Sequence, residues 1–175
     1  MSKPRKMLPD WEAPYIQSLV KLIETQSKPT LANWCISYCE AHILPIFEKH
    51  CPGDMRPRNA LNAAREWLDG KIKLPVAKAV ILDCHAAARE LEHDPTAQAC
   101  ARAAGQCAST IHSASHCLGI AYYGALAAAY DKLGVDAPWA ALEASSAEEC
   151  GRMEAALRAA AAENEPNPAK FTWQC

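Results

Sequence analysis

The chain has 175 residues and a formal net charge of −2, and half of its residues are apolar although only 7% are aromatic. This length suits one domain with a buried core, and a composition rich in alanine favours closely packed helices over strands. The nearly balanced charge offers no basic field to phosphate backbones, so we expect no nucleic-acid partner.

The first half of the chain predicts helices separated by proline and glycine. Apolar spacing and turn residues place them at 11–26, 31–49, 57–69 and 75–93. Pro45 lies inside the second and cannot donate a hydrogen bond to the Ala41 carbonyl, so we expect a kink or an early end there. Gly70 terminates the third helix, and Asp94 with Pro95 terminates the fourth.

Residues 96–133 form the longest stretch that favours a helix, about 57 Å if it were continuous. That length exceeds a compact domain of this size, so we expect a break at 112–116 and an antiparallel hairpin of 96–111 and 115–133. Residues 103–130 carry no formal charge, yet their hydroxyl, amide and imidazole groups would be costly in lipid. We therefore expect this stretch to be the most buried part of a bundle, without membrane association.

The last third predicts a short helix at 138–144 and a final helix that reaches 163. Ser146 and Glu149 have the spacing of a capping box, which places the start of the final helix at Ser146. Residues 1–10 and 164–175 are expected to be irregular tails. The chain, 1–175, is thus predicted to be a single all-α domain, a bundle of six to seven helices with a central alanine-rich antiparallel hairpin.

Nine cysteines raise the question of disulfides or metal. The odd count and the lack of an apolar signal segment predict reduced thiols and a cytoplasmic protein. Cys35, Cys39 and His42 share one predicted helical stripe with apolar residues, and this favours core packing over a metal site. We expect no cofactor and no bound metal.

His112 and His116 lie four residues apart, but the metalloprotease pattern fails because Ser113 stands where a catalytic glutamate would be needed. If the helix breaks between the two histidines, they flank a turn and satisfy backbone groups. No motif for acyl transfer, nucleoside triphosphates or dinucleotides is present. The sequence therefore favours a binding protein over an enzyme.

Arginine and tryptophan concentrate in residues 54–70, and both types are enriched in interface hot spots. Arg58 and Arg65 occupy the stripe of the 57–69 helix that should face the core. We expect Arg65 to be a structural residue, largely buried and paired with a carboxylate from the set Asp54, Glu40, Glu48, Asp83 and Glu90. Arg58 should lie nearer the surface and contribute to partner binding.

Five segments together resemble a known bacterial family. They are Trp-Cys-Ile-Ser-Tyr-Cys at 34–39, His-Ile-Leu-Pro-Ile-Phe-Glu at 42–48, the stretch 54–70, Ala-Arg-Ala-Ala-Gly-Gln-Cys-Ala-Ser-Thr-Ile-His at 101–112, and His-Cys-Leu-Gly at 116–119. The sequence is similar over roughly 31–130 to the all-α, Imm-5-like immunity proteins of polymorphic toxin systems. The resemblance implies a cytoplasmic protein that binds and neutralises a cognate toxin.

The resemblance also indicates which residues to examine. The positions that match recurring polar positions of the family are Asp54, Arg56, Arg58, Arg65, Trp67, His112 and His116. Of these, we expect Asp54, Arg56, Arg58 and Trp67 to bind the partner, and Arg65, His112 and His116 to be structural. Two alternatives remain, a metal- or thiol-dependent helical enzyme and a small-ligand-binding bundle, and a homodimer is left open.

Overall fold

The computed structural model describes residues 3–173, and within that range every regular element is helical. The predicted all-α class is confirmed. The elements are α1 (Pro14–Ile23), α2 (Lys28–Tyr38), the π-helical segment η1 (Cys39–Ile43), α3 (Leu44–His50), α4 (Arg56–Leu68), α5 (Leu74–Glu90), α6 (Pro95–Ser109), the 3₁₀ segment η2 (Ala114–Leu118), the π-helical segment η3 (Ile120–Ala125), α7 (Leu126–Leu133) and α8 (Trp139–Ala160). None of these helices combines the length and the apolar character needed to cross a bilayer.

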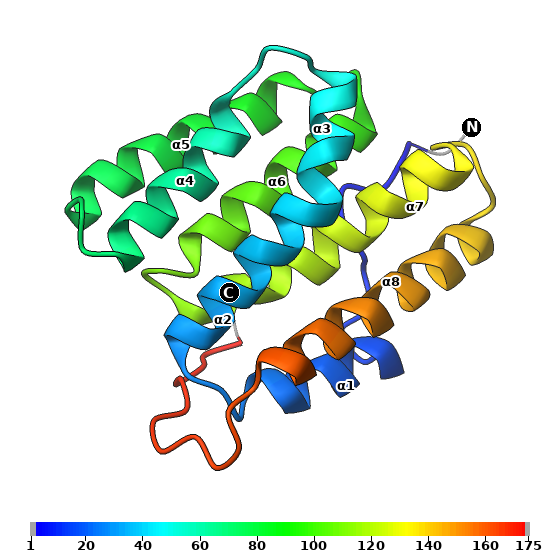
Figure 1. Ribbon diagram of the computed structural model, residues 1–175. Helices are drawn as coiled ribbons and strands as arrows, with labels where there is room; N and C mark the ends of the chain where they lie inside the picture. Colours follow the sequence, from blue (N-terminus) through cyan, green and yellow to red (C-terminus); the bar gives the residue numbers. More distant parts are fainter. Residues whose placement is uncertain (1–2, 174–175) are drawn as a thin grey trace.

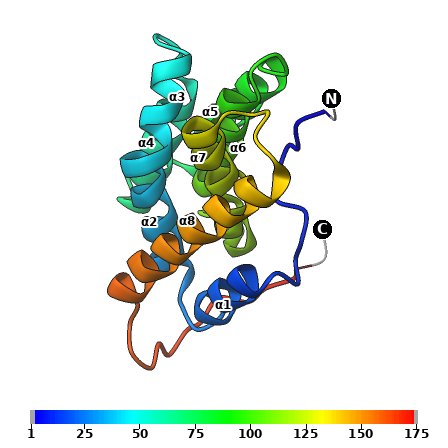
Figure 2. The ribbon, with the colours of Figure 1, turned by 90° about the vertical axis from the view of Figure 1, so that its right-hand side faces the viewer.

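Helix α6 lies at the centre of the bundle. It contacts α3, α4 and α5 as well as η3 and α7, and Figure 1 shows α4 and α5 side by side on one side of α6, with α7 on the other. Helix α8 packs against α7 and α1, and Figure 2 shows α8 running across the view between these two helices. Every residue of 103–130 except His112 is buried or partly buried, which confirms the predicted burial of this uncharged stretch.

Small residues bring the segment after α6 close to α6 itself. Gly119 lies between η2 and η3 with helical backbone angles, φ −59° and ψ −27°. A Cβ atom built on Gly119 would lie 2.3 Å from Cβ of Gln106 on α6. Real carbon atoms do not approach this closely, so the contact requires glycine.

The second predicted helix is interrupted by one π turn. The N–H of Leu44 bonds to the carbonyl of Cys39, five residues earlier, and α3 begins immediately afterwards with Pro45 in its first turn. Proline is tolerated there because the N–H groups of a first turn lack helical partners. The interruption expected at Pro45 is thus present as η1.

The predicted division of the final helix is wrong, because α8 runs unbroken from Trp139 to Ala160. Ser146 is fully buried, and its hydroxyl donates to the Ala125 carbonyl at 3.4 Å. Glu149 accepts a hydrogen bond from Tyr38 at 2.5 Å. The side chains of the two residues that resemble a capping box therefore form hydrogen bonds with neighbouring elements, and no helix starts at Ser146.

Both ends of the described chain are irregular and packed against the bundle. The Leu8 N–H donates to the Tyr122 carbonyl at 3.0 Å, and the Ala169 N–H donates to the Gln26 carbonyl at 2.8 Å. The predicted tails at 1–10 and 164–175 are described over 3–10 and 164–173, while 1–2 and 174–175 lie outside the described residues.

Candidate functional site

The loop before α4 and the first turn of α4 carry a connected set of ion pairs. Asp54 accepts hydrogen bonds from the backbone N–H of Arg56 at 3.0 Å and from its guanidinium at 2.7 Å. Glu90 of α5 accepts from the same guanidinium at 2.8 Å. These hydrogen bonds from Arg56 hold the pKa values of both carboxyls below their ordinary range. Arg56 therefore links the loop to α5 while its side chain stays 34% exposed.

Two further arginines, seven residues apart on α4, pair with the neighbouring α2–η1–α3 segment. Arg58 donates to Glu48 of α3 at 2.6 Å. Arg65 donates to both oxygens of Glu40 in η1, at 2.9 and 2.7 Å, and to the Ser37 hydroxyl at 3.0 Å. The two ion pairs hold α4 against the segment that leads into it.

The predicted pairing of Arg65 with a carboxylate is confirmed, but its predicted burial is wrong. The side chain of Arg65 is 35% exposed, close to the 42% of Arg58. Ala60, Leu61 and Ala64 occupy the fully buried stripe of α4, which leaves the arginines at the margin of that stripe. Arg65 and Arg58 consequently differ much less in environment than their positions in the sequence suggested.

Trp67 is partly buried against the core near the C-terminal end of α4. It lies about 16 Å along the helix from Arg56, at 1.5 Å per residue, so these two residues are not brought together. Met55, between Asp54 and Arg56, is 49% exposed and was not predicted, because it lies in the turn before α4 where helical periodicity gives no signal. Asp54, Met55, Arg56, Arg58 and Trp67 are together termed the α4 surface.

The structure brings His112 and His116 together and adds a third histidine that the sequence did not indicate. Their rings meet edge to face with centroids 5.3 Å apart, and His116 Nδ1 lies 2.8 Å from the Gln106 side-chain oxygen. The expected backbone partner for His116 is therefore wrong, because a side-chain amide takes that role. His85 of α5 lines the same pocket. It could not be predicted from spacing because α5 and η2 are distant in sequence.

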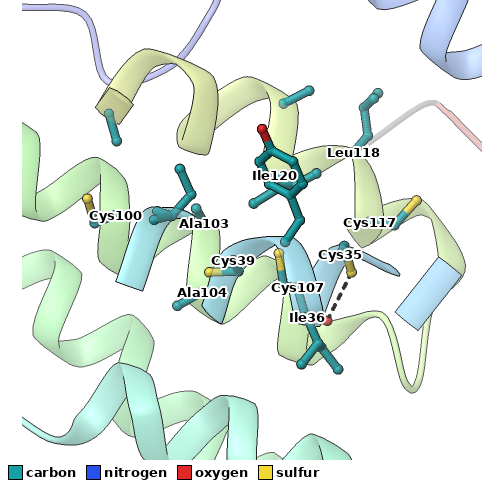
Figure 3. Close-up of a cluster of buried hydrophobic side chains, with 14 of the residues drawn as sticks. Cys35, Ile36, Cys39, Cys100, Ala103, Ala104, Cys107, Cys117, Leu118 and Ile120 are labelled. Atoms are coloured by element: carbon teal, nitrogen blue, oxygen red, sulfur yellow. Dashed lines mark hydrogen bonds between the residues drawn. The ribbon is translucent and has the colours of Figure 1, made fainter. Parts of the chain in front are cut away.

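The cysteines lie mostly in the core, as Figure 3 shows for Cys35, Cys39 and Cys107. Burial raises the pKa of the Cys107 thiol and raises that of Cys84 to about 12, so these groups remain protonated at neutral pH. A protonated thiol is a poor nucleophile and a poor metal ligand.

The predicted common stripe of Cys35, Cys39 and His42 is wrong for His42. The π turn of η1 changes the rotation of the helix, so His42 is exposed and its ring lies against that of Tyr38, with centroids 4.4 Å apart and planes tilted by 42°. Among the described residues, no group of three or more His, Cys, Asp or Glu side chains is arranged to hold a metal ion.

An apolar groove of about 530 Å³ lies between α2–η1 and α8. Trp34 and Tyr38 form one side, and Ala156 and Ala160 form the other. The Trp34 indole N–H donates to the Met153 carbonyl at 3.0 Å, which fixes the ring in the wall of the groove. None of the site residues predicted from the sequence lines this groove.

Comparison with known proteins gives one family. The chain matches the family described as Imm-5 like putative immunity protein over residues 21–156, a range that includes the α4 surface, the three histidines and most of α8. No curated protein and no solved structure matches the chain significantly. Because the match covers most of the chain and agrees with the segments that suggested it, the chain belongs to the Imm-5-like family of immunity proteins.

Proposed function

We propose that this chain is a bacterial immunity protein that binds one cognate toxin molecule in the cytoplasm and neutralises it by binding, without catalysis. The family match over residues 21–156 carries the proposal. The simplest physical route to neutralisation is that the bundle blocks the access of substrate to the active site of the toxin. A standard interface of about 1,600 Å² in total is sufficient for stable association.

The α4 surface is the proposed binding region. Arg56 and Arg58 each keep more than a third of their side chains exposed although carboxylates hold them. An arginine held in place before binding loses less side-chain entropy when a partner arrives. Met55 adds an exposed apolar group beside them, and methionine adapts its shape to a partner surface.

The geometry also suggests how charges would be exchanged on binding. Glu48 is 36% exposed, and Glu90 is 62% exposed, so a carboxylate of the partner can approach either arginine from the solvent side. The arginine would then bridge an internal and an external carboxylate. Such a rim interaction contributes mainly to orientation and to the rate of association.

The proposal is tested by expressing the proteins encoded by the genes next to this one, each alone and together with the chain, and measuring growth. Expected is growth in the presence of the wild-type chain and recovery of a one-to-one complex. Arg58→Glu should weaken the complex about tenfold or more, because it places a like charge opposite the proposed partner carboxylate.

Arg158→Glu is the matched control, because Arg158 is also an exposed arginine paired with a carboxylate, Glu154, but on α8. It should leave the complex unchanged. Growth arrest with no complex would contradict the function, whereas a complex that is weakened equally by both variants would contradict only the assignment of the α4 surface.

A further inference from the structure

A pocket of about 320 Å³ opens between α5, α6 and η2. Its polar lining includes the three histidines His85, His112 and His116, termed the pocket histidines, together with Lys78. None of the carboxylates within residues 3–173 lines it. The pocket thus offers several hydrogen-bond donors and one permanent positive charge, with no acidic side chain to neutralise them.

The pocket histidines have unused hydrogen-bonding capacity. Nδ1 of His85 is buried and has no partner among the described residues. Nδ1 of His116 is hydrogen-bonded to the Gln106 side-chain oxygen, which leaves the second ring nitrogen available for a hydrogen bond to a ligand. The ring of His85 lies against Gly105, where a Cβ atom would come within 2.5 Å of it, so the missing side chain leaves the space for the imidazole.

The charged groups that shift the pKa values of the pocket histidines most are cationic. Burial lowers the pKa of His85, with further lowering from Arg102, His116, Arg89 and His112. Partial burial is the main cause that lowers the pKa of His112, and His116, Lys78 and Lys28 lower it further. For His116 burial alone lowers the pKa.

None of these four permanent cations is paired. Lys28, Lys78, Arg89 and Arg102 form no salt bridge with any carboxylate of residues 3–173, whereas most other arginines of the chain do. An uncompensated positive region on a chain of net charge −2 marks where an anion would be attracted.

One apolar side chain of the pocket is widely exposed. Leu82 lines the pocket and is 64% exposed. A phosphate ion would gain nothing from Leu82. An aspartate or glutamate side chain carries its charge on an aliphatic stem, and its neighbours in a polypeptide can cover Leu82.

We propose that this pocket binds an acidic side chain of a polypeptide partner, with the carboxylate held by Lys78 and the pocket histidines and the adjoining residues packed on Leu82. The site is separate from the α4 surface, and the inference does not depend on the proposed function. Because bound carboxylate favours charged imidazole, binding should strengthen as the pH falls below neutrality.

The test is a titration of the full chain with a capped tripeptide that has leucine on both sides of one glutamate, followed through the imidazole signals in NMR spectra at about pH 6. The expected result is saturable movement of the signals of all three pocket histidines. A tripeptide with glutamine in place of glutamate should produce no such movement. Lys78→Ala and His112→Ala should each weaken binding about tenfold, because each removes a charge-assisted hydrogen bond.

Lys71→Ala and His93→Ala are matched controls, because both residues are exposed and lie outside the pocket. Both should bind the tripeptide as the wild type does. No saturable response to the glutamate peptide, or equal weakening in the control variants, would overturn the proposal. Inorganic phosphate is titrated in parallel, and binding of phosphate as tight as that of the peptide would also overturn it, since contact with Leu82 would then contribute nothing.

Discussion

Gly119→Ala tests the close packing of the segment after α6 against α6. The backbone of Gly119 is already helical, so alanine can adopt its φ and ψ without strain. The added methyl group, however, would lie 2.3 Å from Cβ and 2.6 Å from Cγ of Gln106. Cβ is fixed to the α6 backbone, so a change of side-chain rotamer cannot relieve the contact and the two segments must separate.

The expected cost is that of overpacking a core, about 1–3 kcal/mol in the free energy of unfolding. For a domain of this size, this corresponds to a fall in Tm of about 2–12 °C. The same displacement should disturb the contact between Gln106 and His116, so the His116 imidazole signals should shift in NMR spectra.

Gly151→Ala is the matched control within the same chain. Gly151 lies in α8 and is exposed, and a Cβ atom there would meet nothing within 4 Å. Alanine should therefore stabilise the protein by about 0.5–1 kcal/mol through its higher helix propensity. Thermal and urea unfolding measure both variants. A Gly119→Ala protein as stable as the wild type, or a Gly151→Ala protein destabilised to the same extent, would refute the packing argument.

Three further changes test other parts of the structure. Arg65→Ala should lower the free energy of unfolding by about 1 kcal/mol in urea denaturation, because its ion pair with Glu40 is bidentate but a third exposed. The control Arg158→Ala should lower it by less than about 0.5 kcal/mol, and equal losses would count against the role of Arg65. Trp34→Phe removes the buried hydrogen bond to the Met153 carbonyl and should cost about 1 kcal/mol in the same assay, and an unchanged midpoint would argue against that bond. The pKa values of the pocket histidines are lowered in the folded chain, so the unfolded chain binds more protons below about pH 6.5. The free energy of unfolding should therefore decrease as the pH is lowered from about 7 to about 5. A stability that does not vary with pH in this interval would contradict the partial burial of His85 and His116.

The sequence predicts the helices well where apolar periodicity and proline or glycine agree. The end of α4 before Gly70 is an example, because Gly70 adopts φ +71°, a conformation that glycine accepts without steric cost. The prediction fails at Ser146, where a local capping pattern competes with tertiary contacts and the tertiary contacts prevail. Local sequence cannot reveal that Ser146 meets Ala125 and that Glu149 meets Tyr38, since these partners lie on other elements.

In the candidate sites too, local sequence predicts some features and tertiary packing decides the others. The pairing of Arg65 was predictable because a guanidinium beside a core stripe needs an acceptor, but its exposure depended on how far α4 is rotated toward the core. His85 joins His112 and His116 only because α5 and η2 both pack on α6. Spacing along the chain carries no information about such a contact.

The most direct test of the proposed function is calorimetric titration of the purified chain with any protein from a neighbouring gene that arrests growth, with the activity of that protein measured in the same samples. Binding should saturate at a one-to-one ratio, with toxin activity lost in proportion to the complex formed. Full toxin activity in the presence of a molar excess of the chain, with no heat of binding, would contradict it.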